Sequence, residues 1–163
     1  MASRRPPRLH RDLYRGLQRY FLTICTIHRL DHFATRERAE MAMGQLLLTA
    51  AGYSFEIIAY CFMPDHAHGL FESKTEDADF LKFVCMYKQR SAFEFKKTTG
   101  GRLWQEGFYD HVLRDEESTL SVAAYIIQNP VRAGLCKDPR EYPFVGSSQY
   151  SLDQLVDAIP WRP

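Results

Sequence analysis

Long apolar segments and closely spaced cysteine pairs are both missing from this 163-residue chain. No apolar run approaches the roughly 20 residues that a helix needs to cross a bilayer, so a membrane-spanning protein is not expected. The first residues, Met-Ala-Ser-Arg-Arg-Pro-Pro-Arg, are basic but no apolar stretch follows them, so we expect no secretory signal. The four cysteines are far apart in the sequence: Cys25, Cys61, Cys85 and Cys136. This spacing predicts free thiols in a reducing cytoplasm rather than disulfides or a zinc site.

Internal repeats and low-complexity linkers are also missing. Apolar residues make up 45% of the chain and charged residues 25%, which is ordinary for a globular protein. A chain of this length is large enough to bury one core. We therefore expect a single domain, with a basic arm at 1–16, a core at 17–138 and a tail at 139–163.

A strong excess of charge is absent too, since the formal net charge is only +1. The basic residues are nevertheless concentrated in two stretches. One contains Arg4, Arg5, Arg8, Arg11, Arg15 and Arg19; the other contains Lys82, Lys88, Arg90, Lys96, Lys97 and Arg102. Screening confines each charge to about 10 Å, so a local cluster can attract phosphates whatever the total charge. Two interpretations stay open: contacts with nucleic acid, or a solvated helix face and a solvated arm.

The pattern of apolar residues predicts an α+β fold. Residues 20–27 are aromatic and β-branched, which is typical of a strand. From Thr35 to Gly52 apolar residues recur every three and four positions, which predicts a helix with Thr35 as its N-cap. Further elements are expected as strands at 54–63 and 66–72, a helix at 77–97, extended chain within 102–114, and a helix at 116–128 that Asp115 caps and Pro130 ends. This order favours a two-layer ferredoxin-like sandwich, with helices on a mainly antiparallel sheet and a C-terminal tail wrapping the domain.

Two histidines, His66 and His68, flank a single alanine in one of these expected strands. Side chains alternate along a strand, so both imidazoles point to the same face, about 7 Å apart along the backbone. That arrangement lets two imidazoles bind one divalent metal. The alternative is a pair of polar residues on a wet sheet face. Apolar neighbours on both sides favour a central strand, where two unpaired imidazoles would be costly to bury.

Tyr125 is a candidate nucleophile because it lies one helical turn before Asn129, on the same face of the expected helix. Two ligands do not complete a metal site, and Asn129 and Gln128 are the candidates for a third. A phenol has a pKa of about 10 and is a poor nucleophile unless a nearby cation favours the phenolate. Tyr87, on the basic helix, is the rival nucleophile. Tyr125 can also be read as a packing residue, and Asn129 as a helix stop before proline.

Together these segments carry a resemblance to a known family. Met63-Pro64-Asp65-His66-Ala67-His68 resembles the HUH motif (histidine, hydrophobic residue, histidine) of single-tyrosine transposases. The stretch from Tyr125 to Leu135 is similar to the REP-associated tyrosine transposases, as are Leu103-Trp104-Gln105 and Phe108-Tyr109-Asp110-His111. The match covers about residues 17–150. Either motif alone is weak, whereas the combination is specific.

The resemblance implies a metal-dependent endonuclease that cuts single-stranded DNA beside a palindromic hairpin. The products are a 5′-phosphotyrosine and a free 3′-hydroxyl that is ready for strand transfer. By motif, His66 and His68 are metal ligands, Tyr125 is the nucleophile, and Asn129 is the third ligand where insertion-sequence relatives have Gln. The implied metal is Mg²⁺ or Mn²⁺, although imidazole suits zinc at least as well.

The expected DNA contacts lie in the arm, on the basic helix and after Tyr125: Arg4, Arg5, Arg8, Arg11, Lys88, Arg90, Lys96, Lys97 and Arg132. Arg132 can equally be a solvated loop residue. Trp104 and Phe108 either stack on unpaired bases or pack in the core. Two alternatives remain for the function: an HUH nickase of the replication-initiator or relaxase type, and a catalytically vestigial DNA-binding module. The expected location is the bacterial cytoplasm, at the nucleoid.

Overall fold

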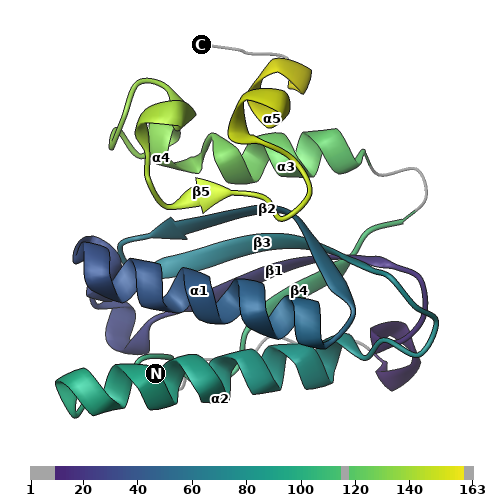
Figure 1. Cartoon of the computed structure of the whole chain (residues 1–163), viewed down its shortest axis with the longest axis horizontal. Helices are drawn as coiled ribbons and strands as arrows, with labels where there is room; N and C mark the ends of the chain where they lie inside the picture. The colour runs from purple at the N-terminus through teal and green to yellow at the C-terminus, as the bar shows by residue number, and fades with distance from the viewer. Residues whose placement is uncertain (1–9, 115–117, 160–163) are drawn as a thin grey trace, which may run out of the picture.

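The computed structural model describes residues 10–114 and 118–159. An antiparallel sheet of five strands runs through its centre in the order β4–β1–β3–β2–β5 (Figure 1). The strands are β1 (Arg19–Cys25), β2 (Phe55–Met63), β3 (His66–Ser73), β4 (Tyr109–Val112) and β5 (Val145–Gly146). Helix α1 (Arg36–Gly52) follows β1, and helix α2 (Phe80–Thr99) follows β3. The first four strands with these two helices confirm the predicted ferredoxin-like α+β fold.

Helices α1 and α2 cover one face of the sheet (Figure 1). Thr35 is the N-cap residue of α1, as predicted. Helix α2 begins slightly later than expected, because the Asp79 side chain accepts a hydrogen bond of 3.0 Å from the Lys82 amide and caps it. Large aromatic side chains fill the space beneath the helices, and the rings of Tyr20 and Phe80 stack 4.1 Å apart. This face therefore forms a closed aromatic core.

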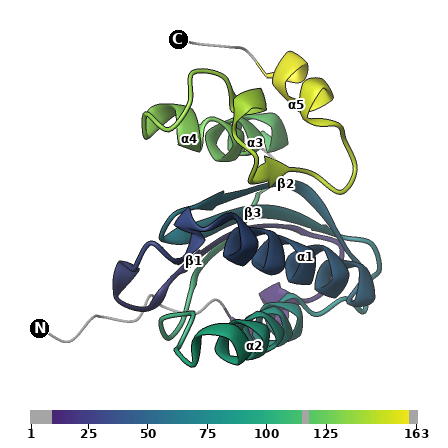
Figure 2. The same cartoon turned by 60° about the vertical axis from the view of Figure 1, so that its left-hand side comes forward.

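The opposite face carries α3 (Thr119–Ile127), α4 (Asn129–Arg132) and α5 (Leu152–Ala158) (Figures 1 and 2). A second apolar cluster lies beneath them: Ile58, Leu70, Ala123, Ile126, Ile127, Val145 and Leu155. Helix α3 presents small and branched apolar side chains to the sheet at every third or fourth position, which is why it packs there. Helices thus cover both faces. No helix of the described residues is long and apolar enough to cross a bilayer.

The residues expected as a wrapping tail contribute regular structure of their own. Strand β5 pairs with β2 at Cys61↔Val145 and extends the sheet. Helix α5 starts with a capping box in which Ser151 and Gln154 bond to each other's backbone amides. A strand of two residues gives almost no sequence signal, so the pattern did not predict it.

A β-bulge in β2 sets which of its residues face α3. The pairing with β3 shifts between Ile57 and Ala59, and both Ile58 and Ala59 belong to the cluster under α3. The extra residue reverses the alternation along the rest of the strand. As a result Cys61 and Met63 lie on the α3 face, opposite His68 and His66 respectively in the neighbouring strand.

The last predicted helix differs from α3 and α4 at both ends. Asp115, the expected cap, lies outside the described residues, and Ser118 is the N-cap, accepting from the Ser121 amide at 3.2 Å. Helix α3 ends at Ile127, one residue before the predicted end, and the chain then forms the single turn α4, so Pro130 does not stop the helical segment as predicted. Pro130 fits in the first turn of α4, where its missing N–H has no helical partner to lose.

Candidate active site

The turn between β2 and β3 fixes the position of the two histidines. The carbonyl of Asp65 accepts from the Thr26 amide at 3.0 Å and from its hydroxyl at 2.9 Å. The Asp65 carboxylate pairs with Arg29 at 2.8 Å and with His66 Nδ1 at 2.6 Å. Arg29 adopts a left-handed conformation, with φ of 56°. The segment after β1 therefore holds Asp65 at two points: Thr26 bonds to its backbone carbonyl and Arg29 pairs with its carboxylate.

His66 and His68 point to the α3 face, as the strand alternation predicted. Their Nε2 atoms lie 3.1 Å apart. Each Nδ1 has a separate partner: the Asp65 carboxylate for His66, and the Thr23 hydroxyl at 2.7 Å for His68. An ionised carboxylate only accepts, so the tautomer of His66 with its proton on Nδ1 donates to Asp65 and turns the Nε2 lone pair toward His68. Such outer partners are typical of metal-binding histidines, whose orientation they fix.

Burial keeps His68 neutral. Only 8% of the residue is exposed. Desolvation lowers the pKa of His68 to about 3, and the positive charges of His66 (when protonated), Arg132 and Arg29 act in the same direction. A neutral imidazole is the form that binds a metal.

The spacing of the two imidazoles fits one divalent ion. The two Nε2 atoms are 3.1 Å apart, so one ion could contact both. It would need a lone pair on each Nε2, with His68 protonated at Nδ1, from which the Thr23 hydroxyl can accept a hydrogen bond. Among the described residues, no three His, Cys, Asp or Glu side chains are grouped so that they could hold a metal ion.

Asn129 and Gln128 follow α3 directly. Gln128 keeps helical φ and ψ, so Asn129 stays one turn beyond Tyr125. The Asn129 Nδ2 atom is buried and has no hydrogen-bond partner in the described chain. Its amide has the same shape in both orientations, so a flip would place the carbonyl oxygen at that position. No hydrogen bond joins either amide to His66 or His68 in the described segments, and the choice of third ligand stays a prediction.

Tyr125 comes together with the histidines, although they are far apart in the sequence. Its ring centroid lies 5.8 Å from that of His68 and 6.1 Å from that of Phe21, edge-on in both cases. About half of the residue, 49%, is exposed. Arg132 fixes it from the solvent side: the guanidinium carbon lies 4.3 Å from the ring centroid, and Nη2 donates to the Tyr125 carbonyl at 2.6 Å. The phenol is thus accessible, beside two imidazoles and under a permanent cation.

Comparisons with known proteins show which family the chain belongs to. The family model described as "Transposase IS200 like" matches residues 16–129, which is more than half of the chain. The chain belongs to this transposase family. It is 26% identical to a putative REP-associated tyrosine transposase of Haemophilus influenzae over 152 residues, covering 86% of this chain and 84% of that protein. It is 25% identical to a REP-associated tyrosine transposase of Escherichia coli K12, covering 85% of each.

Solved structures show the same fold. A REP-associated tyrosine transposase bound to a REP hairpin superposes with a TM-score of 0.72 at 23% identity, over 86% of this chain and 81% of that one. A putative transposase from Deinococcus radiodurans gives a TM-score of 0.52 at 22% identity, over 78% and 96%. Family membership makes this chain a DNA-binding, DNA-processing protein of DNA transposition.

The three aromatic residues of this transposase that were alternatives for catalysis or base stacking, Tyr87, Trp104 and Phe108, are all buried. Tyr87 is 1% exposed and donates to the Ala42 carbonyl at 3.1 Å. Burial also raises the pKa of Tyr87 far above its usual value. The rival nucleophile is therefore ruled out: it is a core residue. Trp104 and Phe108 are each 5% exposed, and the Trp104 indole donates to Ser91 at 2.9 Å, so core packing rather than base stacking is their role.

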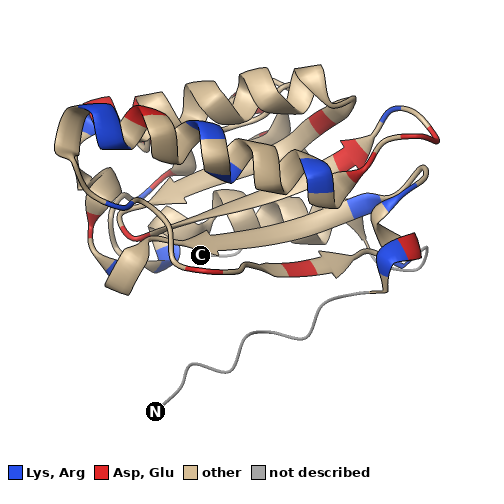
Figure 3. Ribbon diagram, turned by 90° about the horizontal axis from the view of Figure 1, so that it is seen from below, with Lys and Arg blue, Asp and Glu red and all other residues tan. Residues whose placement is uncertain are grey.

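The basic residues of the transposase lie in several places. Arg4, Arg5 and Arg8 are outside the described residues. Helix α2 lies on the sheet face opposite the histidines, and its Lys and Arg residues are spread along it (Figure 3). Lys88 donates to the carbonyls of Gln105 and Gly107 at 2.9 and 2.7 Å and so ties down the loop before β4. Lys88 thus has a structural role, and its expected contact with DNA stays a prediction.

The other basic residues on α2 are more accessible. Arg90 lies 6.0 Å from the ring centroid of Tyr53, and Lys97 pairs with Glu94 at 2.7 Å. Lys96 is exposed and borders a shallow pocket. None of these contacts prevents an approaching phosphate from competing, so their role in DNA binding stays a prediction.

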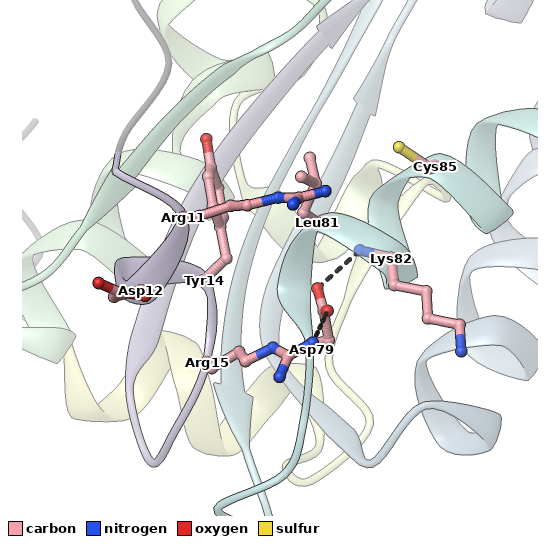
Figure 4. A pocket seen from close by; sticks show the side chains of 8 residues that line it. All are labelled: Arg11, Asp12, Tyr14, Arg15, Asp79, Leu81, Lys82 and Cys85. Atoms are coloured by element: carbon pink, nitrogen blue, oxygen red, sulfur yellow. Dashed lines mark hydrogen bonds and ion pairs between the residues drawn. The ribbon is translucent and has the colours of Figure 1, made fainter.

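Arg11 borders a pocket of about 560 Å³ between the 3₁₀ helix η1 (Arg11–Tyr14) and the start of α2 (Figure 4). Arg15 and Lys82 line it too. Arg15 is partly neutralised by Asp79 at 3.4 Å. Three basic residues, Arg11, Arg15 and Lys82, and two acidic ones, Asp12 and Asp79, therefore line this pocket, and neither histidine of the candidate site does.

Sequence reasoning missed the residues that support the histidines: Thr23, Asp65 and Arg29. Thr23 pairs with His68 across two strands, and its role depends on a register that the sequence does not state. The sequence could have indicated Asp65, because a carboxylate directly precedes His66 in the turn. It gave no indication of Arg29, since the approach of Arg29 to Asp65 depends on the left-handed turn after β1.

Proposed function

We propose that this transposase is a divalent-metal-dependent endonuclease and strand transferase, which acts on single-stranded DNA beside short palindromic hairpins. One observation carries the proposal: Tyr125, half exposed, lies against His68, whose Nε2 is 3.1 Å from that of His66. The REP-associated tyrosine transposase that was solved bound to a REP hairpin has the same fold, which supports the choice of a hairpin as substrate.

The proposed reaction is an in-line displacement at phosphorus. The Tyr125 oxygen attacks the scissile phosphate, a Tyr–O–P bond forms, and the bond from phosphorus to the 3′ oxygen breaks. The phenolic proton is lost from Tyr125, and the leaving 3′ oxygen gains a proton, so that a 5′-phosphotyrosine and a free 3′-hydroxyl result. Attack by a 3′-hydroxyl on the phosphotyrosine reverses these bonds and rejoins strands.

Each residue near the phenol has a role in this scheme. His66 and His68 would hold Mg²⁺ or Mn²⁺, with Asn129 as the proposed third ligand. A bound divalent ion would supply Lewis-acid polarisation of the phosphate. Asp65 and Thr23 orient the imidazoles, and Arg132 holds Tyr125 in place while its positive charge attracts the phosphate. Action on chromosomal repeats would place the protein at the nucleoid of the bacterial cell.

The test uses labelled single-stranded oligonucleotides with a short palindromic hairpin and unpaired flanks, taken from the DNA around the protein's own gene. With Mg²⁺ or Mn²⁺ we expect a protein–DNA adduct that survives denaturation, together with a free 3′-hydroxyl fragment. The same oligonucleotide annealed to its complement is the matched control and should give no adduct. Equal cleavage in EDTA would refute the metal dependence, and cleavage that leaves a free 5′-phosphate with no adduct would refute the covalent mechanism.

A further inference from the structure

A groove beside the candidate active site extends beyond the residues used in the chemistry proposed above. It holds about 520 Å³ and runs between α3 and the edge of the sheet formed by β1 and β4. Its lining includes Phe21, Tyr109, His111 and Ser121, together with His68 and Tyr125. The groove therefore opens directly from the candidate active site.

The register of the sheet places Tyr109 in line with His68. Thr23 is paired with His68 on one side and with Tyr109 on the other. Paired residues point to the same face, and neighbouring strands are about 4.8 Å apart, so the backbones at Tyr109 and His68 are about 10 Å apart. A DNA strand whose phosphate lies at His68 could therefore carry a neighbouring base to Tyr109.

The groove has the form of an aromatic platform. Phe21 forms its floor, with its ring 6.2 Å from that of Tyr109 and 6.1 Å from that of Tyr125, edge-on to both. Tyr109 is 51% exposed, because its strand lies at the edge of the sheet and its side chain lines the groove. Every nucleobase has a flat π-face, so exposed aromatic rings bind unpaired bases with little sequence preference. The Ser121 hydroxyl at the rim can hydrogen-bond the edge of such a base.

We propose that this groove binds one unpaired nucleobase next to the scissile phosphate, stacked on Tyr109. The inference rests on the proposed function, because the groove is continuous with the site of phosphate cleavage. A paired base is stacked between its neighbours and cannot enter. The groove thus selects single-stranded DNA at the cleavage position, while the hairpin stem lies elsewhere.

Binding measurements in EDTA test this separately from cleavage, which is not expected to proceed there. The probe is the hairpin oligonucleotide with single-stranded flanks, and a set of abasic versions that each lack one base within four nucleotides of the stem. For the wild type, one abasic position should weaken binding by roughly 5- to 150-fold, the loss expected for one stacked base. Tyr109→Ala should weaken binding of the intact DNA by a similar factor and should be insensitive to that abasic position.

Tyr109→Phe keeps the stacking ring and should bind within threefold of wild type, which separates stacking from misfolding. Tyr150→Ala removes another tyrosine that is 48% exposed and lies outside the groove, and is the matched control. The inference is overturned if Tyr109→Ala binds like wild type, or if it loses the same factor on every abasic DNA as on intact DNA. If these binding results are obtained but no covalent adduct forms in Mg²⁺ or Mn²⁺, base binding in the groove is supported and the proposed cleavage reaction is refuted.

Discussion

The two faces of strand β1 differ in what their side chains do. Tyr20, Leu22 and Ile24 point toward α1 and α2 and are at most 2% exposed. Phe21, Thr23 and Cys25 alternate with them on the α3 face, and all three stay partly exposed. The same backbone thus supports a closed core on one side and an open site on the other. Substitutions on the two faces should therefore separate stability from activity.

The largest effect is expected from the paired imidazoles. His66→Ala and His68→Ala should each reduce cleavage in Mg²⁺ or Mn²⁺ about a thousandfold or more, because one imidazole cannot hold and orient the ion. Lewis-acid polarisation is worth several kcal/mol, and each 1.4 kcal/mol is about tenfold in rate. Initial rates on the hairpin oligonucleotide are the measurement, and hairpin binding should weaken only slightly. His10→Ala, at an exposed position, is the control. Undiminished cleavage by His66→Ala or by His68→Ala would refute the proposed metal site.

The core face should show the converse behaviour. Phe83 is fully buried, and Phe83→Ala should lower the free energy of unfolding by about 3–5 kcal/mol. This corresponds to a fall in Tm of roughly 10 °C, measured by thermal unfolding. Cleavage at a low temperature, where the variant is folded, should stay near the wild-type rate. Phe93→Ala on the same helix removes a ring that is 63% exposed and should change stability by about 0.5 kcal/mol or less. Equal losses in both variants would contradict the core assignment.

Residues behind the imidazoles should give intermediate effects. Asp65→Asn and Thr23→Val each keep the side-chain shape but disturb a hydrogen bond to an Nδ1 atom. Apparent Mn²⁺ affinity, measured from the metal dependence of cleavage, should fall about 10- to 100-fold. Thr23→Ser keeps the hydroxyl and should retain most of the affinity. Loss in Thr23→Ser equal to that in Thr23→Val would show that packing, not the hydrogen bond, is responsible.

The sequence predicted the ferredoxin-like fold because its first strand is rich in aromatic and β-branched residues, and because its first long helix has clear periodicity with Thr35 as N-cap. It pointed to His66, His68 and Tyr125, which the structure brings together, because the two histidines share a motif and Tyr125 follows at a recognisable distance. Their catalytic roles stay predictions. It did not predict the bulge at Ile57, the two-residue β5 or the burial of Tyr87. Those features depend on which strands meet and in which register, and a single sequence does not state this. Thr23 and Arg29 were missed for the same reason.

A smaller effect is expected in the pocket between η1 and α2. If DNA phosphates reach it, Arg11→Ala and Lys82→Ala should each reduce the slope of log affinity against log salt. The reduction per lost contact should be about 0.7 for single strands or 0.9 for duplex. Lys74→Ala removes a surface charge that is already paired with Glu56 and should leave the slope unchanged. Unchanged slopes in all three variants would place the DNA elsewhere.

The cysteines allow a buried and an exposed thiol to be compared without a change in the candidate active site. Burial raises the pKa of Cys61 to about 12, whereas Cys85 is exposed. The thiolate is the reactive form, so at pH 8 the Cys61 thiol stays protonated and shielded in the native protein. Labelling with a thiol reagent followed by peptide mapping should find Cys85 modified and Cys61 unmodified until the protein unfolds. Early labelling of Cys61 would mean that the α3 face opens readily.

The central claim is that Tyr125 carries the covalent bond to DNA. The most direct measurement is proteolysis of the denatured protein–DNA adduct and identification by mass spectrometry of the residue that bears the nucleotide. We predict that the nucleotide is on Tyr125, that Tyr125→Phe forms no adduct while still binding the hairpin, and that Tyr150→Phe forms adduct like wild type. A nucleotide found on any other residue, or an adduct that persists in Tyr125→Phe, would contradict the account.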